Sequence, residues 1–278
     1  MDQNNWRLIL DPLGDGVINM VKDRAILIAC NEGETPATLR LYGWQKPTLS
    51  IGYSQDVSKN IDLESCEQNR ISVVRRFTGG RALLHQYELT YSLVAPIPHK
   101  AFPGSLRGAF EKISQAILES LKLVKIEGVK VAEKKDRKSG FEPKRFPACF
   151  SVANHFEITV EGKKLIGSAQ RRLRSAFLQH GSLILDMNPK LTHTLLKYPS
   201  EFDSQAVLKY LMSKTTTLKQ ILNKDLEHDE VAQWFLKGFQ KSFSGNWSEG
   251  QLNKRESDLL ESFLTSQVKK IENSGFLN

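Results

Sequence analysis

The sequence has few cysteines and no long hydrophobic run, and both shortages exclude classes of protein. Its 278 residues contain only Cys30, Cys66 and Cys149, with no C-x-x-C pair. Such an odd, sparse set makes neither a disulfide framework nor a cysteine-based zinc site. We therefore expect reduced thiols, one of which can be reactive. No apolar run is long enough to span a bilayer.

The N-terminus also lacks the features of a secretion signal. The stretch MDQNNWRLIL begins with an acid and amides, where a signal peptide needs basic residues and a long apolar stretch. We therefore expect a cytoplasmic protein that does not bind a membrane. Acidic residues are the minority among the charged ones, since 39 Lys and Arg against 31 Asp and Glu give a net charge of +8. This charge favours encounters with acidic partners, either nucleic acid or an acidic carrier protein, and does not choose between them.

The hydrophobic patterns predict an α/β (α+β) fold. Strand patterns occupy residues 6–10, 38–44, 48–53, 71–75, 88–95, 155–160, 163–173 and 177–186. Helix patterns occupy residues 16–30, 62–70, 105–123 and most of the chain after residue 190. This order predicts a mixed, largely antiparallel sheet flanked by helices.

Residues 75–85, RRFTGGRALLH, form the most unusual stretch. Glycines lie between two predicted strands, and a glycine backbone lets a ligand approach closely and offers its N–H groups to an anion. Three arginines can donate charge-assisted hydrogen bonds to a phosphate: Arg75, Arg76 and Arg81. The alternative is a β-turn with surface arginines, but the combination favours a loop that faces a phosphate or an acyl carrier. His85 alone also suits a hydrogen-bonded histidine at a strand edge.

Two later strands carry further polar residues at strand spacing. In residues 163–172, KKLIGSAQRR, alternation places Lys164, Ile166, Ser168 and Gln170 on one face. Spacing alone favours a solvated edge lysine over a functional one. In residues 179–186, QHGSLILD, His180 precedes a glycine, and such a histidine is more often structural than chemical.

Cys149 ends a charged segment, residues 133–150, that contains glycine and two prolines and has no regular period. These features predict a surface loop, and long irregular loops are often functional. Lys144 and Arg145 precede the cysteine, and positive surroundings lower a thiol pKa from ~8.5 towards ~3.5–7.5. From these residues alone, an inert thiol remains the more common outcome.

Together these motifs resemble the lipoate-protein ligase and octanoyltransferase superfamily. RRFTGGRALLH resembles its R-R-x-[ST]-G-G-[RG]-A-[VL]-x-H signature, KKLIGSAQ its lysine element G-x-K-[IVL]-x-G-[SN]-A-[QY], and QHGSLILD its H-G-[ST]-[LI]-L strand. The three motifs in the right order are specific, whereas any one alone is weak, and the resemblance covers most of residues 6–186. PACFSVANHFEITVEGKK further resembles the cysteine octanoyltransferases of the LipM type.

The resemblance implies a fold shared with biotin-protein ligases, although the G-R-G-R-x-G-R element of those enzymes is absent. It implies a catalytic domain over residues 1–215 and a short helical extension, residues 216–278, packed on it. It also implies transfer of an octanoyl group from acyl carrier protein to a lysine of a lipoyl domain, usually the glycine cleavage H protein. A thioester donor is already activated, so neither ATP nor a metal is expected.

The resemblance also implies roles for individual residues. Cys149 matches the nucleophile, and Lys164 matches the family's binding lysine. The residues that the matched motifs assign to substrate binding are Arg75, Arg76, Thr78, Gly79, Gly80, Arg81, His85, Gly167, Ser168, Ala169, His180 and Gly181.

Three other functions remain open. An ATP-dependent lipoate-protein ligase uses the same loop and lysine without a cysteine, but residues 190–278 do not resemble the accessory domain that many ligases carry. An amidotransferase moves octanoyl between lipoyl domains through a loop cysteine, whereas the histidines of RALLH and QHGS favour the octanoyltransferase branch. The charge of +8 also permits a non-catalytic nucleic-acid-binding protein, although we expect no nucleic-acid partner.

Overall fold

A computed structural model describes residues 3–132, 157–199 and 202–274. Its centre is an eight-stranded sheet in the order β11-β1-β2-β6-β10-β9-β8-β7. The strands are β1 (Asn5–Gly14), β2 (Ala37–Trp44), β6 (Tyr87–Pro96), β7 (Val129–Val131), β8 (Ile158–Val160), β9 (Lys163–Arg172), β10 (Ala176–Asp186) and β11 (Asn246–Glu249). Strand β1 is parallel to both of its neighbours, and the other pairs are antiparallel. The predicted mixed, largely antiparallel sheet is confirmed.

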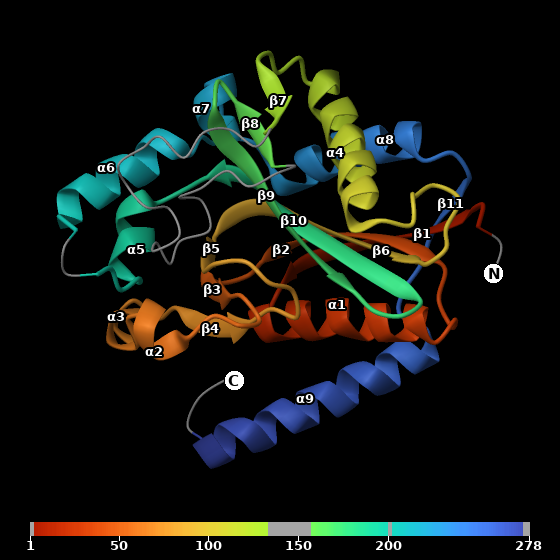
Figure 1. The fold of residues 1–278 in the computed structure, drawn as a ribbon, viewed down its shortest axis with the longest axis horizontal. Helices are drawn as coiled ribbons and strands as arrows, with labels where there is room; N and C mark the ends of the chain where they lie inside the picture. The colour runs from red at the N-terminus through yellow and green to blue at the C-terminus, as the bar shows by residue number, and fades with distance from the viewer. Residues whose placement is uncertain (1–2, 133–156, 200–201, 275–278) are drawn as a thin grey trace.

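Helices cover both faces of this sheet (Figure 1). Helices α1 (Gly16–Asn31) and α9 (Lys254–Ser274) pack together on one side, and α4 (Leu106–Leu123) and α8 (His228–Ser242) on the other. The helix predicted over residues 105–123 is confirmed as α4, in which Ile113, Ile117 and Leu121 are buried and Leu106 is 48% exposed. Each buried aliphatic side chain contributes roughly 1.5–3 kcal/mol, so these faces hold the helices on the sheet.

A second, three-stranded sheet in the order β4-β3-β5 lies beside the first. Its strands are β3 (Thr48–Ile51), β4 (Ser72–Arg75) and β5 (Leu83–His85). The nearby short helices are α2 (Val57–Asn60), α3 (Leu63–Gln68), α5 (Pro189–Thr194) and α6 (Ser204–Lys214), and α7 (Leu218–Leu222) contacts β10. Strands β2 and β3, which only residues 45–47 separate, therefore belong to different sheets.

Helix starts follow their capping residues. Asp62, which the sequence places at the start of a helix, accepts a hydrogen bond from the Ser65 backbone N–H and begins α3. Ser105 begins α4 in the same way through Gly108 N–H. These caps satisfy backbone donors that the first turn of a helix leaves without partners.

The C-terminal region is not wholly helical, because β11 extends the large sheet. Its Asn246 pairs in parallel with Asn5 of β1. Helix α9 is fixed by a buried ion pair, in which Arg7 contacts both carboxylate oxygens of Glu256 at 2.5 and 2.7 Å. Residues at the two ends of the chain are thereby joined.

Two of the three cysteines are buried. Cys30 lies in an apolar cluster at the end of α1, and burial raises its thiol pKa to about 12. Cys66, whose neighbours in the sequence are polar, packs in an apolar cluster with Ile61 and Ile71, and burial raises its pKa to about 11. Both thiols therefore stay protonated at neutral pH and are poor nucleophiles.

Candidate active site

A cavity of about 260 Å³ lies where the large sheet, the small sheet and α1 meet. Nine of the residues predicted to bind substrate line it: Arg76, Gly80, Arg81, His85, Gly167, Ser168, Ala169, His180 and Gly181. The other lining residues are Met20, Tyr42, Leu83, Thr90, Glu157 and Ser182. The structure thus brings all three sequence motifs together around one space.

The glycine loop joins β4 to β5 and is held from inside by Arg76. This buried guanidinium donates to the Ser50 carbonyl at 3.0 Å and to the Ser50 hydroxyl at 2.6 Å. It also donates to the carbonyls of Gly79 and Arg81 at 3.2 and 2.9 Å. Gly80 takes a φ of +100°, which favours glycine. Arg76, which was predicted to bind a phosphate, therefore holds the glycine loop in place.

Arg75 has a similar structural use and does not line the cavity. Its Nη1 donates to the carbonyls of Gly52, Tyr53 and Gln55 at 3.1, 3.1 and 2.9 Å. These contacts hold the chain after β3 against the glycine loop.

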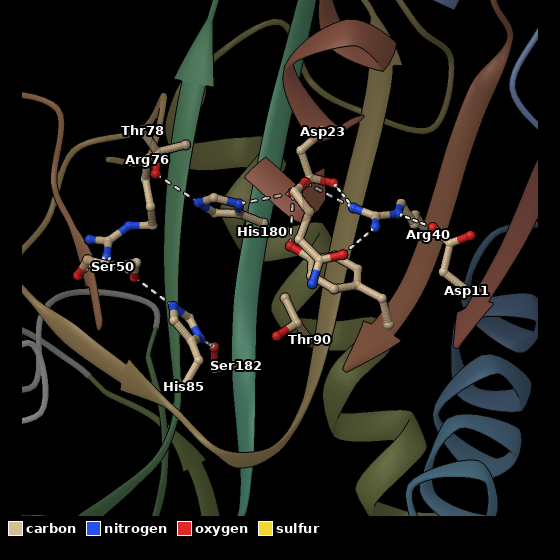
Figure 2. A network of polar contacts seen from close by, with 12 residues as sticks. Asp11, Asp23, Arg40, Ser50, Arg76, Thr78, His85, Thr90, His180 and Ser182 are labelled. Carbon is tan, nitrogen blue, oxygen red and sulfur yellow. Dashed lines mark hydrogen bonds and ion pairs between the residues drawn. The ribbon is translucent and has the colours of Figure 1, made fainter. Parts of the chain in front are cut away.

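His180 lies between a hydroxyl and a carboxylate (Figure 2). Its Nε2 is 2.7 Å from the Thr78 hydroxyl of the glycine loop, and its Nδ1 is 3.3 Å from Asp23. Asp23 also accepts from Arg40 at 2.7 Å and from the Tyr42 hydroxyl at 3.0 Å. Burial alone would raise the pKa of Asp23, but Arg40 and His180 outweigh it and lower the pKa. The carboxylate is therefore charged.

His85 also lies between a hydroxyl and a carboxylate, and Figure 2 shows its contact with the Ser50 hydroxyl. Its Nε2 is 2.5 Å from the Ser50 hydroxyl, and its Nδ1 is 2.7 Å from Glu88. Burial lowers the pKa of His85, although Glu88 opposes that effect. A neutral ring satisfies both contacts if Nδ1–H donates to Glu88 and Nε2 accepts from Ser50. Trp44 stacks on the ring with centroids 3.9 Å apart.

The glycines of β9 and β10 let these two strands approach at the cavity wall. A Cβ at Gly181 would lie 2.6 Å from both the Gly167 carbonyl oxygen and the Ser168 hydroxyl, and 2.7 Å from the Tyr91 ring. Ser168 is itself 2.7 Å from the Tyr91 hydroxyl. The wall at this point is therefore backbone and a hydroxyl, which gives a ligand access to both.

Lys164 is buried, so the interpretation as a solvated edge lysine is wrong. Its Nζ is 2.5 Å from Glu157, and the two side chains are 1% and 3% exposed. Glu157 lines the cavity, and Lys164 is not among its lining residues. Strand β9 carries a register irregularity opposite Ile158 and Thr159, and Leu165 and Ile166 are both buried. Simple alternation therefore does not describe this end of the strand.

The remaining predicted residues divide into three groups. Thr78 and Gly79 touch the site through His180 and Arg76. Arg75 lies outside the cavity lining. Cys149, predicted as the nucleophile, lies outside the residues that the structure describes.

Several residues of the site were not predicted from the sequence, namely Met20, Asp23, Arg40, Tyr42, Glu88, Thr90, Glu157 and Ser182. Two of them carried a usable signal. Glu88 follows His85 by three residues across a strand boundary, and Ser182 shares a strand face with His180 by alternation. Asp23 carried none, because it lies on a helix 157 residues from His180.

Neither a metal centre nor a membrane span occurs in the described part of the chain. Within it, no three His, Cys, Asp or Glu residues are grouped so that they could hold a metal ion. No helix there is long and apolar enough to cross a membrane.

Comparisons with known proteins agree on one family. Residues 15–240 match the family "Lipoyl protein ligase A/B catalytic domain". The octanoyltransferase LipM of Geobacillus kaustophilus (strain HTA426) is 37% identical over 245 residues, covering 88% of each chain. That of Bacillus subtilis (strain 168) is 31% identical over 261 residues, covering 94% of each. A bipartite lipoate protein ligase structure from Thermoplasma acidophilum superposes with a TM-score of 0.77 at 20% identity, covering 95% of this chain and 94% of that one.

Proposed function

This chain belongs to the lipoyl protein ligase A/B catalytic domain family and, within it, to the LipM octanoyltransferases, and from that premise we propose how it moves an acyl group. It takes octanoyl from the phosphopantetheine thioester of acyl carrier protein, holds it on Cys149 and delivers it to a lysine of a lipoyl domain. The observation that carries the proposal is the single cavity lined by all three motifs.

The first step is a thioester exchange. The Cys149 thiolate attacks the octanoyl carbonyl, a new carbon–sulfur bond forms, and the bond to the pantetheine sulfur breaks. The pantetheine thiolate leaves and takes up a proton. Because the donor is a thioester and the product is another thioester, the step needs no ATP.

The second step makes an amide. The neutral amine of the acceptor lysine attacks the Cys149 thioester, a carbon–nitrogen bond forms, and the bond to Cys149 breaks. The proton lost from nitrogen goes to the departing thiolate. For Lys164 to stabilise the oxyanion in both steps, as preorganised donors do, its ammonium must reach the cavity past Glu157, which lines it. Its contact with Glu157 holds that ammonium in place.

Binding of the octanoyl chain is apolar. At ~0.8 kcal/mol per buried CH₂, the chain supplies several kcal/mol, and Met20, Tyr42 and Leu83 give the cavity its apolar side chains. Discrimination between chains that differ by one methylene is weak, about 1–3 kcal/mol.

The partners follow from the same reaction. We propose acyl carrier protein as donor and the glycine cleavage H protein as acceptor, both acidic, and a cytoplasmic location. The net charge of +8 would speed the encounter of both with this enzyme.

Intact-protein mass spectrometry tests the proposal. Incubation with octanoyl-acyl carrier protein should add one octanoyl group to the wild-type enzyme, and hydroxylamine should remove it as expected of a thioester. The Cys149→Ser variant should show no thioester adduct and no transfer to H protein, whereas Cys66→Ser, a buried-thiol control, should react normally.

Two results would contradict the proposal. Transfer by Cys149→Ala that requires ATP would make the chain an adenylating lipoate ligase. Loading from an octanoylated lipoyl domain but not from the carrier would make it an amidotransferase.

A further inference from the structure

Two arginines outside the glycine motif have a buried donor atom that lacks a hydrogen-bond partner in the described part of the chain. Arg75 and Arg76 donate to backbone carbonyls, as described above. Arg24 and Arg171 likewise form no ion pair with any residue of the described chain, but they differ in their hydrogen bonds. The Nε atoms of both are buried and have no hydrogen-bond partner there.

Both guanidinium groups lie beside the Phe77 ring, and that of Arg24 also lies over the Phe263 ring at 4.1 Å. The Cζ of Arg24 lies 5.2 Å and that of Arg171 5.0 Å from the centroid of the Phe77 ring. Arg171 is also 5.1 Å from the ring of Tyr53, which meets Phe77 edge-on. Two half-buried cations beside one ring repel each other, and burial lowers the pKa of Arg24. An anion placed between the two groups would offset both effects.

This cluster of Arg24, Arg171 and Phe77 lies next to the cavity in the fold. Phe77 directly precedes Thr78, whose hydroxyl contacts the cavity histidine His180. Arg171 lies two residues beyond the cavity residue Ala169 on the same face of β9, which places it roughly 7 Å further along the strand. On α1, Arg24 lies one turn beyond the cavity residue Met20. The cluster therefore borders the cavity along both elements.

The loop that carries Tyr53 is also held in place. Its carbonyls accept from Arg75, and the Tyr53 N–H donates to the Thr78 carbonyl at 2.8 Å. The aromatic side of the cluster is thus built before any ligand arrives, which lowers the entropic cost of binding.

We propose that Arg24 and Arg171, around Phe77, form a binding site for a phosphate ester, and that the ester is the phosphodiester at the base of the carrier's pantetheine arm. This assignment rests on the proposed function. Planar guanidinium groups match phosphate oxygens in geometry and charge.

The reach of the arm agrees with this placement. About 13 bonds separate the phosphorus from the sulfur, and extended chain gains ~3.5 Å per three bonds, so the arm spans about 15 Å. Along β9, Ser168 and Lys164 lie roughly 10 and 24 Å from Arg171. A phosphate at the cluster would leave the thioester between these two residues, close to the cavity residue Gly167.

The test compares a donor that lacks the phosphate, octanoyl-pantetheine, with two donors that carry it, octanoyl-4′-phosphopantetheine and octanoyl-acyl carrier protein. Arg171→Gln should lower kcat/KM of enzyme acylation by about tenfold for the two phosphorylated donors, the loss expected of one charge-assisted hydrogen bond. Octanoyl-pantetheine should be unaffected. Arg24→Gln should show the same selectivity.

Arg174→Gln provides the matched control. Arg174 is exposed in the turn between β9 and β10, so this variant loses the same charge outside the cluster. It should acylate normally with both small donors. An equal loss with octanoyl-pantetheine for Arg171→Gln, or no loss with octanoyl-4′-phosphopantetheine, would overturn the proposal.

Calorimetric titration tests whether the phosphate that binds here belongs to the pantetheine arm or to a nucleotide. Arg171→Gln should weaken binding of 4′-phosphopantetheine and leave that of pantetheine unchanged. If it weakens ATP binding instead, the site belongs to a nucleotide and the assignment to the arm is wrong. Titration needs no turnover, so it tests the phosphate site even if no donor acylates the enzyme. A failure of all donors to acylate the enzyme would instead contradict the proposed function.

Discussion

Two imidazoles in the cavity wall are each held between a hydroxyl and a carboxylate. His180 links Thr78 to Asp23, and His85 links Ser50 to Glu88. The first chain of contacts ties the glycine loop to β10 of the large sheet, and the second ties β3 and β5 of the small sheet to β6 of the large one. The wall that would face the acyl group is therefore fixed by hydrogen bonds rather than by packing alone.

The low pKa of His85 makes stability depend on pH. Histidine in an unfolded chain has a pKa of about 6.5, so below this pH His85 takes up a proton in the unfolded chain but stays neutral in the folded protein. The unfolding free energy should therefore fall as pH drops from 7 through 6.5 towards the folded pKa, by at most ~1.4 kcal/mol per pH unit for one proton. Urea unfolding at pH 7.5, 6.5 and 5.5 measures this slope.

The variant His85→Asn removes this proton and should flatten the slope. A residual slope remains, because burial also lowers the pKa of His99 and His193. Asp23 and Glu88, whose pKa values are lowered in the folded protein, contribute at lower pH, since their stabilisation is present above about 4. An unchanged slope in His85→Asn would show that His85 does not titrate as the structure implies.

At this scale the sequence predicted which residue types gather but not how they bond. The motif residues His85 and His180 were found, whereas Asp23 was missed because its contact depends on the packing of α1 against β10. Arg75 and Arg76 were expected to bind phosphate from their charge alone. Their carbonyl partners lie in other segments, such as Ser50 and Gly52, which only the fold brings near.

Among the elements, the glycine loop is pressed against the segment after β3. A Cβ at Gly52 would lie 2.0 Å from the Gly80 carbonyl oxygen, whereas a Cβ at Gly79 would meet nothing within 4 Å. The paired glycines of the motif thus have different uses. Gly80 takes a positive φ beside Gly52, and Gly79 leaves open space above the backbone.

This contrast predicts different effects of alanine. Gly52→Ala must move the backbone of one segment, so we expect it to lower the unfolding free energy by about 1–3 kcal/mol, as overpacking does. Gly79→Ala should change stability by less than about 0.5 kcal/mol. Thermal unfolding of the two variants measures the difference, and equal melting temperatures would mean that the close approach of the two segments is not maintained in solution.

The long helices and strands could be predicted from the sequence, whereas the short strand at the edge of the sheet could not. Strand β10 and helix α4 carry a clear period or a capping residue, and both appear where expected. Strand β11 has mostly exposed side chains over four residues, so no burial pattern marks it. Lys164 was misread for the converse reason: its partner Glu157 lies across an irregular β8–β9 pair that alternation does not describe.

The whole molecule places its site between two sheets. Arg76, Gly80, Leu83 and His85 come from the small sheet and its loop, whereas Gly167 and its neighbours on β9 and β10 come from the large one. The small sheet is in turn packed by α5 and α6, which follow β10 in sequence. Segments that precede β9 and β10 in the sequence and segments that follow them therefore hold the cavity wall together.

The net charge of the molecule gives a prediction of its own. If the excess of +8 steers an acidic carrier, raising the salt concentration from 50 to 500 mM shortens the Debye length and should lower kcat/KM for octanoyl-acyl carrier protein severalfold, mainly through slower association. Octanoyl-pantetheine has no net charge, so its kcat/KM should stay nearly constant over the same range. Stopped-flow acylation with both donors measures the two dependences. Parallel curves would contradict steering, because a general effect of salt on the enzyme would act on both donors alike.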